Sequence, residues 1–189
     1  MVGIGLGIAL SIRADLGLAP WDVFHQGIAE RTDVSLGVVI MAVGLVVMVA
    51  WIPLRQRAGL GTVLNVLVIG PSLDVWLRVL PETDAGAARV GYLAASCLAF
   101  GFAGGLYIGS ALGPGPRDGL MTGLSARGFT VWKVRTVIEL TVLLGGWLLG
   151  GSVGIGTIVI ALSLGPLTHV ALRWFHIPVG QHVGEVLAE

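Results

Sequence analysis

Long apolar runs, broken by a few short polar stretches, dominate the pattern of the chain. A transmembrane helix takes about 20 mostly apolar residues, and five of the runs reach that length. They predict spans at Val34–Leu54, Gly61–Leu80, Val90–Ala111, Val131–Leu149 and Ile155–Phe175. A shorter run, Met1–Ile12, comes first and would extend only about 18 Å as a helix. We interpret it as the end of a first span whose earlier residues precede the assigned start codon.

Two segments of the chain resemble two later segments at nearly the same separation. ADLGLAPWDVFHQGIAER (14–31) aligns with SALGPGPRDGLMTGLSAR (110–127), with six identities in 18 positions. GLGTVLNVLVIGP (59–71) aligns with GIGTIVIALSLGP (154–166), with six identities in 13 positions. Shared hydrophobicity does not explain matched Gly, Pro and Asp positions, so the chain is expected to be duplicated. Repeat one covers about residues 1–81 and repeat two about 89–178.

Each repeat would hold three spans, and this odd number implies that the second repeat enters the membrane upside down. Such inverted repeats are frequent in secondary transporters. The predicted fold is therefore an all-α polytopic membrane protein with about six transmembrane helices in two three-span inverted repeats. Basic residues collect on cytoplasmic loops, which predicts that both termini are cytoplasmic. Seven lie on that side (Arg55, Arg57, Arg117, Arg127, Lys133, Arg135, Arg173) and four on the other (Arg13, Arg31, Arg78, Arg89).

The composition agrees with a membrane protein and excludes a soluble domain. Hydrophobic residues make up 55% and charged residues 12%, with a mean hydropathy of +0.91, whereas soluble domains carry about 25% charged residues. We expect one membrane domain, 1–189, whose main partner is the lipid bilayer. The 11 basic and 11 acidic residues balance, which gives no indication of a nucleic-acid partner. A homo-oligomer is compatible with the sequence, which does not fix the oligomeric state.

A Pro two residues before an Asp opens each copy of the first repeated motif. Pro fits the first turn of a helix, and Asp interacts favourably with the unpaired N–H groups there. The pattern predicts short helices at Trp21–Glu30 and Arg117–Ala126, which are too short to span. Either they lie on the membrane surface or they dip in as re-entrant segments. Irregular backbone at membrane depth must be buried in protein or line a wet cavity.

Each polar residue of these motifs has a structural and a functional interpretation. Asp22 and Asp118 either serve only as helix starts or form part of a site. Trp21 is an interface anchor or a ligand, and His25, one turn from Asp22, is a hydrogen-bonding partner or a proton carrier. Arg117 lies at the cytoplasmic headgroups or binds an anion.

Further polar or helix-breaking residues lie within the predicted spans. Pro71 and Pro166 are matched in the two repeats and are expected to kink, and to break, the third and sixth spans. Asp74 and Arg78 are four residues apart, a spacing that favours an ion pair.

An acidic residue inside the fifth span, Glu139, is costly in a bilayer. It either pairs with Arg135 or acts in function. Asn65 and Tyr107 are further polar groups that can face a central cavity. We therefore assign the candidate path of a substrate or ion to Pro20, Trp21, Asp22, His25, Asn65, Asp74, Tyr107, Pro116, Arg117, Asp118 and Glu139. No catalytic residue, metal ligand or cofactor site is assigned.

The succession GLAPWDVFHQGIAERT, WIPLRQRAGLGTVLNVLVIGP, LYIGSALGPGPRDGLMTGLS and GTIVIALSLGP resembles the YczE branch of the YczE/YitT-like bacterial integral membrane proteins. The resemblance covers nearly the whole chain. It implies a bacterial inner-membrane protein in a family of unsettled activity, some members of which are linked to production of secreted secondary metabolites. Members typically begin with additional residues before the glycine-rich first span, which agrees with the short first run here.

The expected function is that of a small-solute transporter or exporter, by analogy with other inverted-repeat proteins. The alternative is a non-transporting membrane factor that supports a membrane-associated process such as secondary-metabolite production. An enzyme is not expected, because no nucleophile, base and acid pattern occurs in register.

Overall fold

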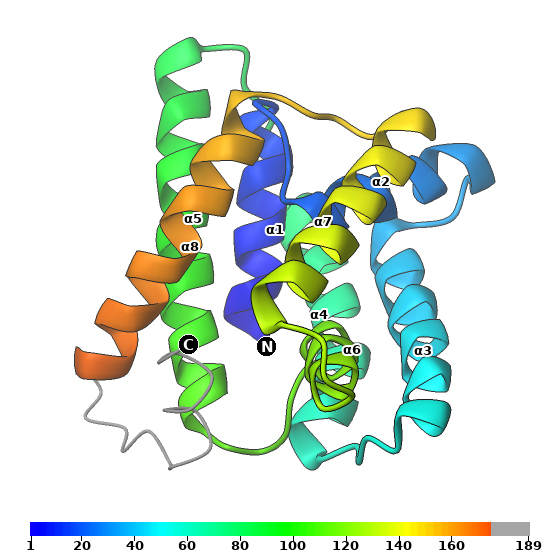
Figure 1. The fold of residues 1–189 in the computed structure, drawn as a ribbon. Coiled ribbons are helices and arrows are strands. Elements are labelled where there is room, and N and C mark those ends of the chain that lie inside the picture. The colour runs from blue at the N-terminus through cyan, green and yellow to red at the C-terminus, as the bar shows by residue number, and fades with distance from the viewer. Residues whose placement is uncertain (175–189) are drawn as a thin grey trace.

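The computed structural model describes residues 1–174, and over this range the chain forms eight α-helices and no strand (Figure 1). The helices are α1 (Val2–Ala14), α2 (Pro20–Thr32), α3 (Leu36–Leu54), α4 (Leu60–Val79), α5 (Gly86–Gly109), α6 (Pro116–Ser125), α7 (Val131–Leu148) and α8 (Ile155–Trp174). The predicted end of the last span at Phe175, the end of repeat two near 178 and the C-terminus lie outside the described residues.

Four helices of the described chain are long and apolar enough to cross a membrane: α3, α4, α5 and α8. Their outer faces carry exposed apolar side chains, as lipid contact requires; Ile52 is 76% exposed and Leu162 72%. The all-α polytopic membrane protein is thereby confirmed. Two of the six predicted spans stay predictions. α1 has only 13 residues, and α7 carries three charged residues in 18.

Both predicted short helices are present, and each begins at its proline, in α2 and α6. The turn before each helix contains a glycine with positive φ, +105° at Gly17 and +110° at Gly113, which other residues rarely adopt. Side chains would also clash there, because a Cβ on Gly17 would meet the backbone of Gly154. These glycines allow the chain to turn inside the protein and start a new helix.

The start of α6 is held by Trp51 near the end of α3. Its indole Nε1–H donates to the carbonyl oxygen of Pro116 at 3.0 Å, and the side chain is 3% exposed. A Cβ built on Gly119 would fall against the same ring. Gly119 thus allows the ring to lie directly against the first turn of α6.

The core lies around α1, which packs on α4 and α5 through small residues. A Cβ at Gly5 would meet Ser72 of α4, and one at Gly7 would meet Phe100 of α5. Ser96 Oγ donates to the Gly7 carbonyl at 2.8 Å. Small residues of this kind let apolar helices approach closely in a membrane, where the hydrophobic effect between helices is weak.

Polar contacts at the helix ends fix the directions of the helices (Figure 1). Arg13, near the end of α1, binds the carbonyl of Leu77 near the end of α4, so these helices run in the same direction. Arg89 at the start of α5 pairs with Asp15 just after α1. α5 therefore runs opposite to α1, and α8 descends beside α5 in Figure 1.

Several contacts recur between segments about 96 residues apart in sequence. The Gly61 N–H donates to the Leu112 carbonyl at 2.7 Å, and the Gly156 N–H donates to the Leu16 carbonyl at 2.7 Å. Helix pairs recur as well: α1 packs on α4 as α5 packs on α8, and α2 packs on α7 as α6 packs on α3. The ends of the short helices follow the same pattern, with Arg31 on the Leu149 carbonyl and Arg127 on the Pro53 carbonyl.

One helix pair breaks this pattern. Asp74 of α4 accepts hydrogen bonds from Ser35 Oγ at 2.8 Å and from the Gly37 N–H at 3.0 Å, which joins α4 to the start of α3. The predicted Asp74–Arg78 ion pair is wrong, because the carboxylate is used by the first turn of α3. α7 and α8, the later counterparts of α3 and α4, do not pack along each other in the described structure.

The prediction that Pro71 and Pro166 break their helices is also wrong. α4 and α8 run without interruption through these residues. A transmembrane helix tolerates a proline when neighbouring groups or local adjustments satisfy the freed carbonyl.

We expect Gly119→Ala to lower the free energy of unfolding by about 1 to 3 kcal/mol, because the added methyl group overpacks against Trp51. Thermal unfolding of the detergent-purified protein measures the effect. Gly91→Ala is the matched control, since a Cβ there has nothing within 4 Å. Equal melting temperatures for the two variants would show that Trp51 does not restrict this position.

We expect Asp74→Ala to destabilise the protein by about 0.5 to 2 kcal/mol, the usual cost of losing a helix cap. The change removes two hydrogen bonds at the start of α3. Asp74→Asn should cost less, because its amide oxygen still accepts one of them. Asp84→Ala, in the exposed loop before α5, is the control, and a loss of the same size there would contradict the role of Asp74.

Candidate functional site

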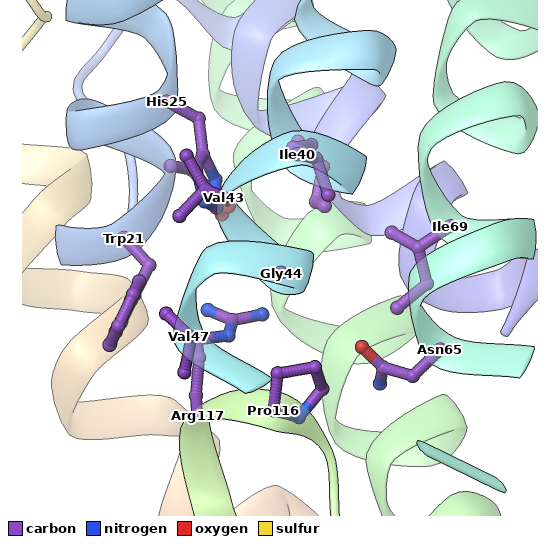
Figure 2. A pocket seen from close by; sticks show the side chains of 12 residues that line it. Trp21, His25, Ile40, Val43, Gly44, Val47, Asn65, Ile69, Pro116 and Arg117 are labelled. Atoms are coloured by element: carbon purple, nitrogen blue, oxygen red, sulfur yellow. Dashed lines mark ion pairs between the residues drawn. The ribbon is translucent and has the colours of Figure 1, made fainter. Parts of the chain in front are cut away.

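A cavity of about 30 Å³ lies where α2 and α6 begin. Its polar lining comes from both short helices and α4, and the rest is apolar and comes from α1, α3 and α4, including Ile8 and Ile69. Six of the predicted path residues surround it: Trp21, Asp22, His25, Asn65, Pro116 and Arg117. The two motifs, 96 residues apart in sequence, therefore meet at one place (Figure 2).

Asp22 and His25 form a buried acid and imidazole pair on α2. They are 2% and 4% exposed, and Asp22 Oδ1 lies 3.7 Å from His25 Nδ1. The predicted hydrogen bond between these atoms is not made, and within residues 1–174 neither atom has another hydrogen-bond partner. Both residues line the cavity, and these two atoms are buried there without a hydrogen-bond partner among residues 1–174.

Arg117 reaches into the cavity from the start of α6. Its guanidinium lies 5.7 Å from the ring centroid of Trp21, and Figure 2 shows it in the space between Trp21 and Asn65. In the described part of the chain no carboxylate forms an ion pair with Arg117. Trp21 is 6% exposed, and its Nε1–H has no hydrogen-bond partner among residues 1–174. Trp21 is therefore a buried residue of the site, and the interpretation as a surface anchor is wrong.

A second polar group surrounds Gly115, the residue before α6. Asn65 Nδ2, Tyr107 Oη and Asp118 Oδ2 all lie within 3.4 Å of the place where a Cβ on Gly115 would be. Tyr107 Oη donates to the Gly113 carbonyl at 2.8 Å and so holds the turn. Of these three side chains, only Asn65 also lines the cavity.

Besides Tyr107 and Asp118, three more predicted path residues lie away from the cavity lining. Pro20 is the first residue of α2, and Asp74 is bound to the start of α3. Glu139 on α7 accepts a hydrogen bond from Arg135 Nε at 3.0 Å, so the predicted pair is confirmed. In the arrangement seen here, none of these three residues lines the cavity, and each affects it only by positioning its helix.

Several residues that shape the site were missed from the sequence. Thr62 is completely buried, and its hydroxyl donates to the Pro114 carbonyl at 2.6 Å, which fixes the turn before α6. The repeated GxGT pattern was a usable signal, because Thr62 and Thr157 each accept a hydrogen bond from the glycine N–H three residues earlier. Trp51 gave no comparable signal, since an aromatic residue near a helix end is common in membrane proteins.

The arrangement suits the binding of a small polar solute. Helix N-termini carry a partial positive charge, and two of them open onto this cavity beside a guanidinium, an indole N–H and one carboxylate. Within residues 1–174, no cluster of three or more His, Cys, Asp or Glu side chains is placed to hold a metal ion.

Sequence comparison supplies the family. The chain is 38% identical over 180 residues to an uncharacterized protein of Haemophilus influenzae, covering 93% of this chain and 83% of the relative. It is 30% identical over 176 residues to the uncharacterized membrane protein YczE of Bacillus subtilis, covering 91% and 81%. No solved structure shows significant similarity. Residues 1–173 match the family of unknown function DUF6198, and the chain therefore belongs to this family of YczE-like integral membrane proteins.

Proposed function

We propose that the protein is a multi-pass transporter of a small solute in the bacterial cell membrane, and not an enzyme. One observation carries the proposal: α2 and α6 begin at the same buried polar cavity and run away from it in opposite directions. α2 ends beside the end of α7, and α6 ends beside the end of α3. Broken or short helices that start at a central site are the usual binding elements of secondary transporters.

We further propose six spans in two inverted repeats, with α1 and α7 as the first and fifth. The recurring contacts of Gly61 with Leu112 and of Gly156 with Leu16 support the repeat. Opposite directions of α1 and α5 support the inversion. The charges of α7 fit a span, because its two basic residues lie in the first two turns, where long side chains reach the interface. The bias of basic residues supports an N-terminus in the cytoplasm.

The difference between the two helix pairs supports alternating access. Transporters of this kind expose a fixed site to either side by moving one repeat against the other. Here α4 is joined to α3 through Asp74, whereas a Cβ built on Gly165 of α8 would meet no atom of residues 1–174 outside its own helix backbone within 4 Å. At the separation of 96 residues, Glu139 corresponds to Val43, which lines the cavity. If α7 and α8 take up the packing that α3 and α4 have here, Glu139 moves toward the site.

We expect Gly44→Leu to lower the initial rate of solute flux at least about tenfold. Gly44 lines the cavity, and a space of about 30 Å³ cannot hold both a leucine side chain and a solute. The measurement is flux into proteoliposomes across a panel of ions and small neutral solutes. Gly91→Leu, which projects into open space on α5, is the matched control. Absence of flux for every solute with the wild-type protein would favour the non-transporting membrane factor.

We expect single cysteines at Thr32 and Phe129 to be labelled from opposite sides of the membrane, in a background where Cys97 is replaced. Thr32 is the last residue of α2, Phe129 follows α6, and both are exposed. Labelling of intact cells with a membrane-impermeant maleimide should modify Thr32→Cys, and Phe129→Cys only after lysis. Labelling of both from one side would contradict the inverted repeats.

A further inference from the structure

We propose that the cavity binds a compact inorganic anion of about the size of chloride, held by Arg117, Trp21 and the first turns of α2 and α6. This inference rests on the proposed function, because it names the class of the transported solute. Its first support is the charge of Arg117. A cation inside a bundle of apolar helices needs a counter-charge, and within the described residues no carboxylate pairs with Arg117.

The second support is an unpartnered donor. The Nε1–H of Trp21 is buried and makes no hydrogen bond within residues 1–174. An unpaired buried donor costs about 1 to 3 kcal/mol, so a ligand that accepts from it is favoured. The guanidinium of Arg117 lies over the face of the same ring, 5.7 Å from its centroid, so a cation and an unpaired donor are close neighbours at the cavity.

The helix starts provide the third support. Ala19 and Gly115, the residues before α2 and α6, make no side-chain hydrogen bond to the first turn. The first-turn N–H groups of both helices therefore lack side-chain caps at the cavity. The Asp22 and Val23 N–H groups donate to the Ala19 carbonyl, and the Gly119 N–H donates to the Gly115 carbonyl. The dipole of a helix still favours negative charge at its start, and two such starts lie at this cavity.

The size of the cavity selects the class of anion. A cavity of about 30 Å³ has room for one or two water-sized groups, since about 10–15 Å³ on this measure holds one water. It admits a monatomic anion and leaves little room for a sugar or a phosphate ester in the arrangement seen here. Apolar neighbours such as Ile8 and Ile69 favour an ion that loses its water easily, which points to chloride over strongly hydrated divalent anions.

Asp22 offers a test in which removal of a charged group is expected to strengthen chloride binding. Its carboxylate lines the same cavity and opposes an anion, while Arg117 favours one. Asp22→Asn should therefore tighten chloride binding several-fold, and Arg117→Gln should weaken it at least about tenfold, the loss expected for a charged hydrogen bond. A cation site predicts the reverse order, and a purely structural role predicts no dependence on the ion.

The experiment measures the thermal unfolding of detergent-purified full-length protein while sodium gluconate is replaced by sodium chloride at constant ionic strength. Binding to the folded state raises the melting temperature by an amount that grows with the logarithm of ligand concentration over Kd. Trp21→Phe should weaken chloride binding about twofold to tenfold, because it removes one neutral hydrogen bond and keeps the ring. Trp132→Phe, on the exposed face of α7, is its control. If Arg117→Gln does not fold, Arg117→Lys, Trp21→Phe and Asp22→Asn still decide the question.

Stabilisation of the wild type by chloride, lost in Arg117→Gln and enhanced in Asp22→Asn, supports the inference. Equal effects of chloride and gluconate, or loss of binding in Asp22→Asn, would overturn it. Flux of a neutral or cationic solute without chloride binding would contradict the anion site but would still support the proposed transport. Chloride binding with no flux of any solute supports the site and overturns transport.

Discussion

Inside a bundle of apolar helices there is no bulk water to pair a backbone N–H or carbonyl group. A helix can therefore begin there only if protein or a bound polar group satisfies its first turn. α2 and α6 both begin in this setting, at Pro20 and Pro116. Proline lacks one of the N–H groups that would otherwise remain unpaired, so each start is less costly than that of an ordinary helix.

The rest of the architecture follows from the need to hold two such starts. Each is preceded by a glycine turn, and each turn is fixed by a hydrogen bond to the start of another helix, from Gly61 to Leu112 and from Gly156 to Leu16. Glycine is required at these contacts because the backbones approach too closely for side chains. One similar block supplies the glycine turn, and the other supplies the helix start that binds the turn. The same contact therefore occurs twice, once between Gly61 and Leu112 and once between Gly156 and Leu16.

Much of this could be predicted from the sequence. The spacing of Pro20 to Asp22 and of Pro116 to Asp118 predicted both short helices, because these residues act on their own helix. Apolar runs predicted the four long helices. Contacts between helices could not be predicted in the same way, because they depend on residues far apart in the chain. The i to i+4 spacing predicted an ion pair for Asp74, yet the carboxylate binds α3, 37 residues earlier.

The candidate site shows the same limit. Composition and spacing identified Trp21 and Arg117 as polar residues of two motifs, but the meeting of the two motifs depends on how six other helices pack. Trp51 contributes to that meeting through one hydrogen bond to a backbone carbonyl, which leaves no periodic signal in a sequence. Its counterpart at the separation of 96 residues, Trp147, is 60% exposed. Residues at matching positions of the two similar segments therefore lie in different environments, so the sequence similarity alone could not predict which of the two tryptophans holds a helix start.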